Sequence, residues 1–429
     1  MRRLTILCIA LTGLGMIAAA ADKPHVLTLK EAHAVALKKN PKITIADLRL
    51  LAAKQVVRQT QAALFPTING ILSGASATQD NARIVASPLT VSSVMDRASG
   101  SVFVSQLITD FGRTAHLTKS SKLRASAEER NVEAVRELLL LQVDSAYFGV
   151  LEANALLEVA GDTMLTRRLL RDQIVTLAKN KLKSELDTSF AEVNYQEALL
   201  LESKAQNDLL SAYASLAALL GQPRIGSFRL AATPAPGGLP ESVGPLMSLA
   251  VENRPDLQRL RLEYGSAAEF AKAEAALNRP TLSVQGTAGV IPWHDKTLNH
   301  DYAAAGFVMN FPFFSGGLNT ARRKEAELRS LAADATVRDE ENNAIRDVRL
   351  AWLSAKNAQE RTAITAKLVE QSRKSLALAQ ARYDVGSSSI VELSQAQLGL
   401  TAAQITHTNA RYEYLVRRSL LDYQTGTLR

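Results

Sequence analysis

Two long stretches of the chain repeat apolar residues at the spacing of an α-helix. They run over about 114–179 and 320–383, and each is followed by a shorter helical stretch, over about 186–220 and 390–424. In the first, one helical face carries Val132, Val135, Leu139, Val143, Ala146, Val150, Ala153 and Leu157. Such spacing is typical of an amphipathic helix. A helix of about 65 residues extends roughly 100 Å, so the pattern predicts an elongated, mainly α-helical molecule.

A broken helix precedes each long one. The first begins at Thr28, with Glu31 three residues later in a capping-box pattern, breaks at Pro41 and stops before Pro66. The second half repeats this order at Pro245, Pro255 and Pro280. The two shorter helices, of about 24 and 35 residues, nearly match the long helix when placed end to end. We therefore expect one continuous helix to lie beside two stacked ones.

The two halves are an internal duplication, because matching residues recur at a constant offset. Asn40-Pro41 recurs as Arg254-Pro255, 214 residues later. Further matches, at an offset of 205, are Gly112 with Gly317, Ala146-Tyr147 with Ala351-Trp352, Ala191 with Ala396, and Gly221 with Gly426. The second copy is therefore nine residues shorter at one place between Pro66 and Gly112. A length change confined to one place marks a surface loop.

Four segments carry no Asp, Glu, Lys or Arg, although 21% of the chain is charged: 67–79, 98–109, 280–294 and 302–321. In the second half Leu282, Val284, Ala288 and Val290 lie on one face of a strand, and Ala303, Ala305, Phe307, Met309 and Phe311 repeat this pattern on the return strand. Gly70 and Gly74 blur this alternation in the first half, so that hairpin rests on analogy with its duplicate. Alternation over about ten residues fits the wall of a transmembrane β-barrel. A soluble hairpin packed on helices is the alternative, since it has the same period.

A membrane location for these strands requires more than one chain. Four strands cannot close a barrel, because the smallest membrane barrels have about eight, and an open edge in lipid leaves backbone groups unpaired. Two chains would supply eight strands and three would supply twelve. Side chains fill the lumen of an eight-stranded barrel, so a conduit favours three chains or more. Trp293 and Tyr302 flank the turn of the second hairpin, where an aromatic girdle would lie.

The N-terminus has the layout of a secretory signal peptide over residues 1–21. Arg2 and Arg3 precede an apolar run, and four alanines then offer small-residue cleavage sites before Asp22. A retained anchor is the alternative. The only cysteine, Cys8, lies inside this segment, so the mature chain would have no disulfide and no thiol chemistry. The mature chain also has no apolar run of the length that a transmembrane helix needs.

Charge and chemistry-bearing residues exclude several classes of protein. Removal of the two signal arginines changes the net charge from +8 to +6, a mild excess that does not indicate a nucleic-acid partner. The histidines have no metal-ligand spacing, and no phosphate-binding loop, nucleophile elbow or paired carboxylates stand out. We therefore expect no enzymatic activity, no metal and no cofactor.

Several segments, taken in order, resemble the TolC-like outer-membrane efflux protein family across essentially the whole mature chain. They are LTLKEAHAVALKKNP, ALFPTI, QLITDFGR, FPFFSGG and ARYDVGSSSIVELSQAQLGLTAAQ. The resemblance implies duplicated long-helix hairpins that form a periplasmic α-barrel, and four β-strands per protomer in a trimeric, twelve-stranded transmembrane barrel. It also implies outer-membrane lipid contacts, a periplasmic adaptor (membrane fusion) protein, and an inner-membrane transporter of the RND, ABC or MFS type.

In such proteins the tunnel closes at the turns between the long helices and the helices that follow. The resemblance assigns adaptor contacts there to Lys181, Leu182, Val385 and Gly386. Lys181 stands where the family usually has glycine. The family's closing network uses an aspartate, a tyrosine and an arginine: here Asp187 and Tyr383 match, but the arginine position is Ser388.

Farther into the entrance, Glu392 matches an acidic position of the family, while Gln395 replaces a second one. Three copies of Glu392 around a narrow axis would create a negative field that favours cations. An ordinary solvated helix residue is the alternative. The ring hypothesis predicts that Glu392→Gln weakens block of the channel by multivalent cations.

The chain thus divides into a signal peptide (1–21), a first repeat (22–221, with a strand hairpin at about 66–109 and long helices at about 114–220), a connector (222–244) and a second repeat (245–429, with a hairpin at about 280–313 and helices at about 320–424). The function expected is an outer-membrane channel that passively conducts substrates from a pump to the outside. A soluble periplasmic coiled-coil rod, structural or adaptor in role, is the alternative.

Overall fold

The computed structural model describes residues 25–75, 82–87, 90–94, 97–222, 228–233, 237–294 and 299–428. The predicted signal peptide, part of the predicted connector and the C-terminal residue lie outside the described residues.

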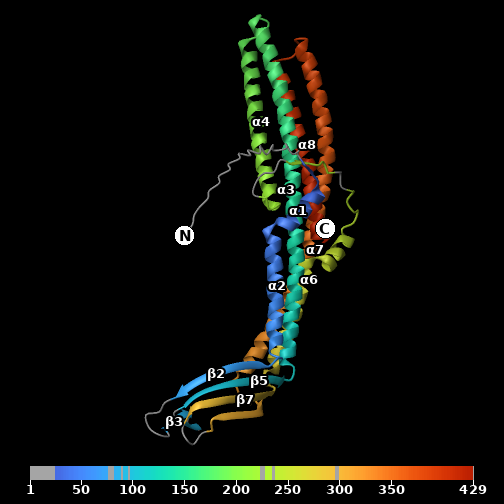
Figure 1. The fold of residues 1–429 in the computed structure, drawn as a ribbon. Coiled ribbons are helices and arrows are strands. Elements are labelled where there is room, and N and C mark those ends of the chain that lie inside the picture. Colours follow the sequence, from blue (N-terminus) through green and yellow to red (C-terminus); the bar gives the residue numbers. More distant parts are fainter. Residues whose placement is uncertain are drawn as a thin grey trace, which may run out of the picture.

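Long helices form a slender rod with a small β-sheet at one end (Figure 1). Helices α3 (Arg113–Lys179) and α7 (Leu318–Asp384) each have 67 residues, which corresponds to roughly 100 Å. The other helices are α1 (Leu29–Lys39), α2 (Pro41–Ala62), α4 (Glu185–Leu219), α5 (Gly244–Asn253), α6 (Pro255–Ala275) and α8 (Ile390–Gln424). Within the described ranges, no helix combines the length and apolarity that crossing a membrane requires.

Local chemistry sets the first helix boundaries. Thr28 caps α1 through the predicted capping box: its hydroxyl accepts from the Glu31 amide, and the Glu31 carboxylate accepts from the Thr28 amide at 2.9 Å. Asn40 ends α1 in an extended conformation and caps α2, where its side chain accepts from the Lys42 amide. Pro41 is then the first residue of α2, a position at which the missing amide proton costs nothing.

The shorter helices stack end to end beside the long ones, as the sequence predicted, and both halves do so in the same way. Gly221, just after α4, has φ +67°, and a Cβ there would lie 2.7 Å from the Lys39 carbonyl oxygen, where α1 ends. Gly426, just after α8, also has φ +67° and would place a Cβ 3.0 Å from the Asn253 carbonyl carbon, where α5 ends. A residue without a side chain is needed at both joints.

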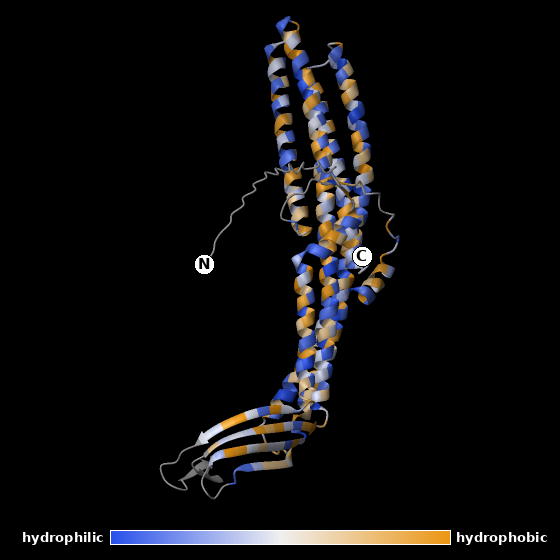
Figure 2. Cartoon of the chain, viewed as in Figure 1, coloured by the Kyte–Doolittle hydropathy of each residue, from blue (hydrophilic) through white to orange (hydrophobic). Residues whose placement is uncertain are grey.

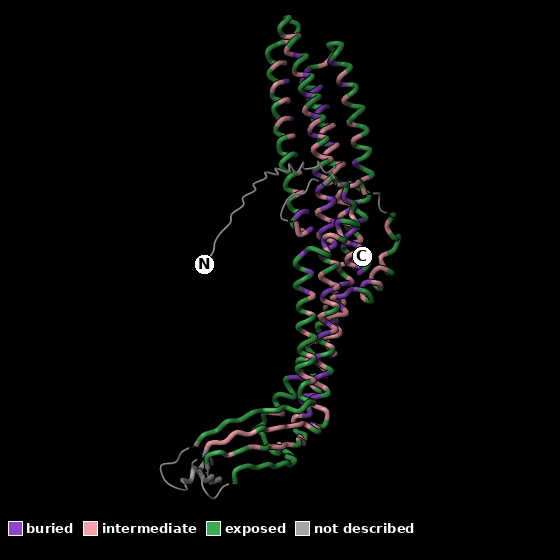
Figure 3. The backbone as a smooth tube through the Cα atoms, in the orientation of Figure 1, coloured by how far each residue is buried: buried purple, intermediate pink, exposed green. Residues whose placement is uncertain are grey.

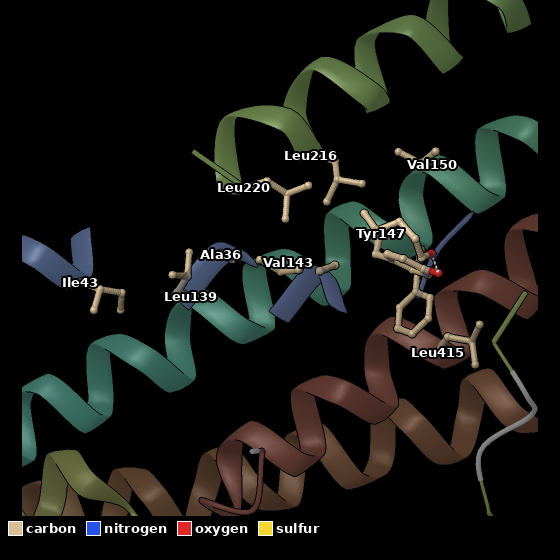
Figure 4. Close-up of a cluster of buried hydrophobic side chains, with 12 residues drawn as sticks. Ala36, Ile43, Leu139, Val143, Tyr147, Val150, Leu216, Leu220 and Leu415 are labelled. Carbon is tan, nitrogen blue, oxygen red and sulfur yellow. Dashed lines mark hydrogen bonds between the residues drawn. The ribbon is translucent and has the colours of Figure 1, made fainter. Parts of the chain in front are cut away.

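The main core lies at this level of the rod (Figure 4). Tyr147 is fully buried there, and its hydroxyl lies 2.9 Å from the Leu27 carbonyl oxygen and 2.8 Å from that of Ala231. These carbonyls flank a short parallel pair, β1 (His25–Leu27) and β6 (Phe228–Leu230). Trp352, the duplicate of Tyr147, likewise donates to the Pro240 carbonyl oxygen. The paired aromatic residues therefore fasten the segments that precede α5 to both long helices.

Four antiparallel strands form the sheet, in the order β2-β5-β7-β8. They are β2 (Thr67–Ala75), β5 (Arg97–Thr109), β7 (Thr281–His294) and β8 (Asp301–Asn310). A small hairpin that the sequence did not predict, β3 (Ala82–Ser87) with β4 (Thr90–Val94), lies between β2 and β5 along the chain. Strand β8 ends at Asn310, so Phe311, which the alternation assigned to this strand, lies beyond it and stacks on Phe313.

Buried and exposed residues are distributed differently over the helices and the sheet. Figure 3 shows buried positions along the facing sides of the helices, and mainly intermediate and exposed positions in the sheet and at the opposite tips of the rod. Figure 2 shows apolar residues in the strands of the sheet as well as along the helices. Exposed apolar side chains lie at both ends of the rod and also along its helices, for example Leu331 and Ile364 of α7.

Candidate functional site

One face of the sheet is apolar across all four strands. Val284 pairs with Phe307 of β8, Ala288 pairs with Val102 of β5, and Val102 pairs with Gly70 of β2. Directly paired residues in neighbouring strands share a face. The face therefore collects Ile68, Leu72, Val102, Val104, Val284, Ala288, Val290, Ala303, Phe307 and Met309. The first-half hairpin, which was predicted only by analogy with its duplicate, thus contributes to the same surface.

This apolar face is strongly exposed in the single chain. Leu72 is 90% exposed and Phe307 76%. The opposite face carries mainly small and polar residues: Asn69, Ser73, Ser101, Ser105, Ser283, Gln285 and Thr287. An apolar outer face opposite a polar inner one is the pattern of strands that separate lipid from an aqueous lumen.

The two residues proposed for an aromatic girdle lie on different faces. A bulge at Ile291 and Pro292 sets Trp293 opposite Ala98, on the apolar face. Tyr302 pairs with Gly289, on the polar face, and a Cβ at Gly289 would lie 2.8 Å from the Tyr302 ring. Tyr302 therefore covers a glycine on the polar face, and Trp293 alone stays a girdle candidate.

Both edges of the sheet are open. Strand β2 pairs only with β5, and β8 pairs only with β7, within the part of the chain that the structure describes. Unpaired backbone groups along an edge are costly in an apolar medium and form a template for a further strand.

At the far end of the rod, the two turns between long and following helices share one geometry. Lys181 has φ +59° and Gly386 has φ +75°. The next amide in each turn, Leu182 or Ser387, donates to a carbonyl oxygen five residues earlier, at 3.0 and 2.8 Å. These are the hydrogen bonds of a helix end closed by a left-handed residue, so Lys181 occupies a position that favours glycine. Leu182 and Val385 are 68% and 78% exposed.

Within one protomer, no hydrogen bond or ion pair of the described residues joins Asp187 to Tyr383. Asp187 is engaged in a capping box with Ser184, whose amide and hydroxyl both donate to its carboxylate, at 3.0 and 2.8 Å. Tyr383 is only 5% exposed, and its hydroxyl has no hydrogen-bond partner among the described residues. The buried Ser388 hydroxyl, at the family's arginine position, likewise has none there.

Glu392 is not a free carboxylate. Its Oε1 lies 2.6 Å from Nη1 of Arg382, and both side chains are about half exposed. Ser389 caps α8, and its hydroxyl accepts from the Glu392 amide at 3.3 Å. The turn between α7 and α8 therefore forms an ion pair that the sequence does not indicate, because Arg382 lies ten residues from its partner and only the fold of the turn joins them.

A polar pair ties the two hairpins together behind the tips. The Asn194 side-chain amide of α4 donates to the Ser394 hydroxyl of α8 at 2.8 Å. The Asn194 carbonyl oxygen accepts from the Arg167 guanidinium of α3 at 2.9 Å. Arg167 is 5% exposed, and this burial lowers its pKa from the ordinary value. Arg167 is thus a buried cation between the helices of the tip half.

Comparisons with known proteins agree with this geometry. The family described as "Outer membrane efflux protein" matches residues 34–222 and 246–427. Outer membrane protein TolC of Vibrio cholerae serotype O1 is 24% identical over 420 residues, which cover 93% of this chain and 91% of TolC. Cation efflux system protein CusC of Escherichia coli O6:H1 is 24% identical over 394 residues, which cover 88% and 81%. The CmeC outer membrane channel of Campylobacter jejuni has the same fold, with a TM-score of 0.79 at 16% identity over 99% of this chain and 94% of that one. Because the two matched segments span most of its length, the chain belongs to the outer membrane efflux protein family.

Proposed function

We propose that this chain is the outer-membrane protomer of an export channel, and that it conducts passively from the periplasm to the outside. The observation that carries this proposal is the apolar face shared by all four strands, at one end of a rod roughly 100 Å long. A face of this kind is suited to lipid, whereas the helices hold the other end far from it. Membership of the efflux family supports this function and counts against the soluble rod.

Three copies assemble into the channel. The open edges of β2 and β8 need partners in lipid, and strand addition between neighbouring protomers supplies them. Three sheets of four strands give twelve strands, enough for a lumen that side chains do not fill. The long helices of the three copies then enclose the periplasmic tunnel, and the polar face of each sheet lines the pore.

We propose that the exposed tips form the contact with a periplasmic adaptor, which links the channel to an inner-membrane transporter. Leu182 and Val385 offer apolar surface there, flanked by Lys181 and by the turn at Gly386. The division into a signal peptide at 1–21, two repeats at 22–221 and 245–429, and a connector between the repeats belongs to the same proposal.

The exported substrate is not fixed by this fold. Relatives with similar identity carry names that refer to cations, to solvents and to toluene. The same protomer architecture therefore accompanies chemically different cargoes.

Membrane fractionation and photocrosslinking test the proposed function. A photoreactive residue at Phe307 should label lipid in proteoliposomes, while the same residue at Thr287, on the opposite face, should not. The protein should also fractionate with outer membranes and migrate as a heat-sensitive oligomer of about three chains. Labelling of position 307 only by water-soluble reagents, together with a soluble monomer, would contradict the channel function and favour the soluble periplasmic rod.

A further inference from the structure

Besides their shared apolar contacts, the two hairpin tips of one protomer are joined by a contact between a cation and an aromatic ring. Lys183, in the turn that follows α3, places its Nζ 4.0 Å from the centroid of the Tyr383 ring, at the end of α7. An ammonium group within about 6 Å of an aromatic ring face is attracted by the negative face of the ring, more strongly where water is partly excluded. Lys183 is half-buried here, so the contact is partly shielded from water.

The surroundings of Tyr383 show which part of its side chain is used. The ring belongs to an apolar cluster drawn from all four helices near the tips: Leu170, Ile174, Ala191, Ala379, Ile390 and Leu393. Its hydroxyl, in contrast, is buried without a partner among the described residues. The ring face, and not the hydroxyl, therefore makes the polar contact at this point.

Two other charged side chains near this contact, Arg382 and Asp187, are engaged within their own hairpins. Arg382 pairs with Glu392 inside the α7–α8 hairpin, and Asp187 caps α4 together with Ser184 inside the other. Lys183 has no ion pair within the described ranges. Its ammonium group therefore reaches from the first tip to the second.

We propose that Lys183 is a positioning residue, which holds the second hairpin tip against the first through the Tyr383 ring and so limits how far the protomer opens at this end. The proposal rests on the proposed function only in identifying this end as the entrance. The contact between the tips exists in the protomer whether or not the protein conducts, and it is tested without transport.

Hydrogen exchange of the purified, full-length oligomer in detergent tests the contact. Lys183→Gln removes the cation and should speed amide exchange at both tips, 177–187 and 380–390, about fivefold. Lys183→Arg keeps a cation and should restore slow exchange. Tyr383→Phe should leave exchange unchanged, because the hydroxyl has no partner. Lys181→Gln is the matched control, since it removes an exposed lysine from the same turn and should change nothing.

Three results would overturn the proposal. One is equal exchange in Lys183→Gln and Lys181→Gln, and another is acceleration confined to the first tip. The third is an effect of Lys183→Gln that persists undiminished in a Tyr383→Leu background.

In planar bilayers Lys183→Gln should raise single-channel conductance while Lys181→Gln does not. If no variant conducts, and the unaltered protein does not either, the proposed function fails and the exchange data still decide whether Lys183 holds the tips together.

Discussion

Lys181 carries a backbone strain that its duplicate avoids. The two tip turns have equivalent hydrogen bonds, but φ is +59° at Lys181 and +75° at Gly386. A side chain in the left-handed region costs about 1 kcal/mol relative to glycine. Lys181→Gly should therefore raise the thermal unfolding midpoint of the tip half. Hydrogen exchange measured at increasing temperature reports this midpoint. Gly386→Ala, the reciprocal change, should lower it, and equal midpoints for both variants would show that the turns relax freely.

Glu392 and Arg382 must be considered as a pair. With Arg382 2.6 Å away, the negative field expected from a ring of Glu392 is weakened by its own hairpin. Arg382→Gln should uncover the carboxylate and strengthen block of single-channel current by a trivalent cation. Glu392→Gln should abolish that gain in the double variant. If Arg382→Gln leaves block unchanged, Glu392 does not face the conducting path and is an ordinary surface residue.

Glu269 makes stability depend on pH in acid. It is buried on α6, and burial opposes its ionisation, but hydrogen bonds from Lys272, Lys119 and His116 outweigh this and lower its pKa from 4.5 to about 2. A carboxylate with a lowered pKa stabilises the fold above its unfolded pKa and loses this contribution as pH falls towards about 2. Both lysines are exposed, so screening reduces the effect to about 1–3 kcal/mol.

Glu269→Gln should therefore lower the unfolding midpoint at pH 7, and the deficit should shrink between pH 4.5 and pH 2. Glu327→Gln is a suitable control on the surface of α7, where the partners of the carboxylate are exposed. A deficit that stays constant down to pH 2 would mean that lost packing, not lost charge, causes it.

At the level of the elements, helices follow from local chemistry and sheet faces do not. The capping box at Thr28, the break at Pro41 and the apolar stripe of α3 each act within a few residues, so the sequence predicted those boundaries to within one or two positions. The face of Trp293 depends on a bulge that appears only when β7 pairs with β5. Simple alternation from Val290 would place Trp293 on the polar face.

The contacts at the tips could not be predicted from the sequence either, because they too depend on residues that are far apart along the chain. Lys183 and Tyr383, or Arg382 and Glu392, meet because turns and hairpins bring distant positions together. The resemblance predicts Asp187 and Tyr383 as members of one closing network; within the protomer, Asp187 caps α4 and Tyr383 contacts Lys183. Residue identity therefore indicated residues of the tips but not the pairs that they form within the protomer.

The sheet register predicts which strand positions tolerate charge. Ala288 and Thr287 are neighbours on β7, but Ala288 lies on the apolar face and Thr287 on the polar one. A lysine on the lipid face near mid-membrane costs about 2–4 kcal/mol, whereas the lumen side accepts it. Ala288→Lys should reduce the amount of oligomer in the outer membrane strongly, and Thr287→Lys only slightly, measured by heat-sensitive migration after membrane extraction. Equal loss in both variants would contradict the assignment of faces.

At the scale of the whole molecule, the proposed assembly of three chains can be tested without knowing the strand register between protomers. If β2 of one protomer adds to β8 of the next, only positions that share a face can be joined. Asn69 lies on the polar face with the even-numbered residues of β8, because Asn69 pairs with Phe103, Phe103 with Thr287, and Thr287 with Ala304. The only cysteine of the chain is Cys8, so an engineered pair in the mature protein has no competing thiol.

Asn69→Cys should therefore be combined in turn with a cysteine at each position from 303 to 308. Mild oxidation should give a covalently closed oligomer only with even-numbered partners, strongest where the true register brings two Cβ atoms within about 4.5 Å. Odd-numbered partners are the built-in control, since they share the strand but face lipid. Equal crosslinking with odd-numbered and even-numbered partners would show that the two edges meet in an unfolded form. A stable oligomer without any crosslink would mean that the chains associate through their helices while the sheets stay apart.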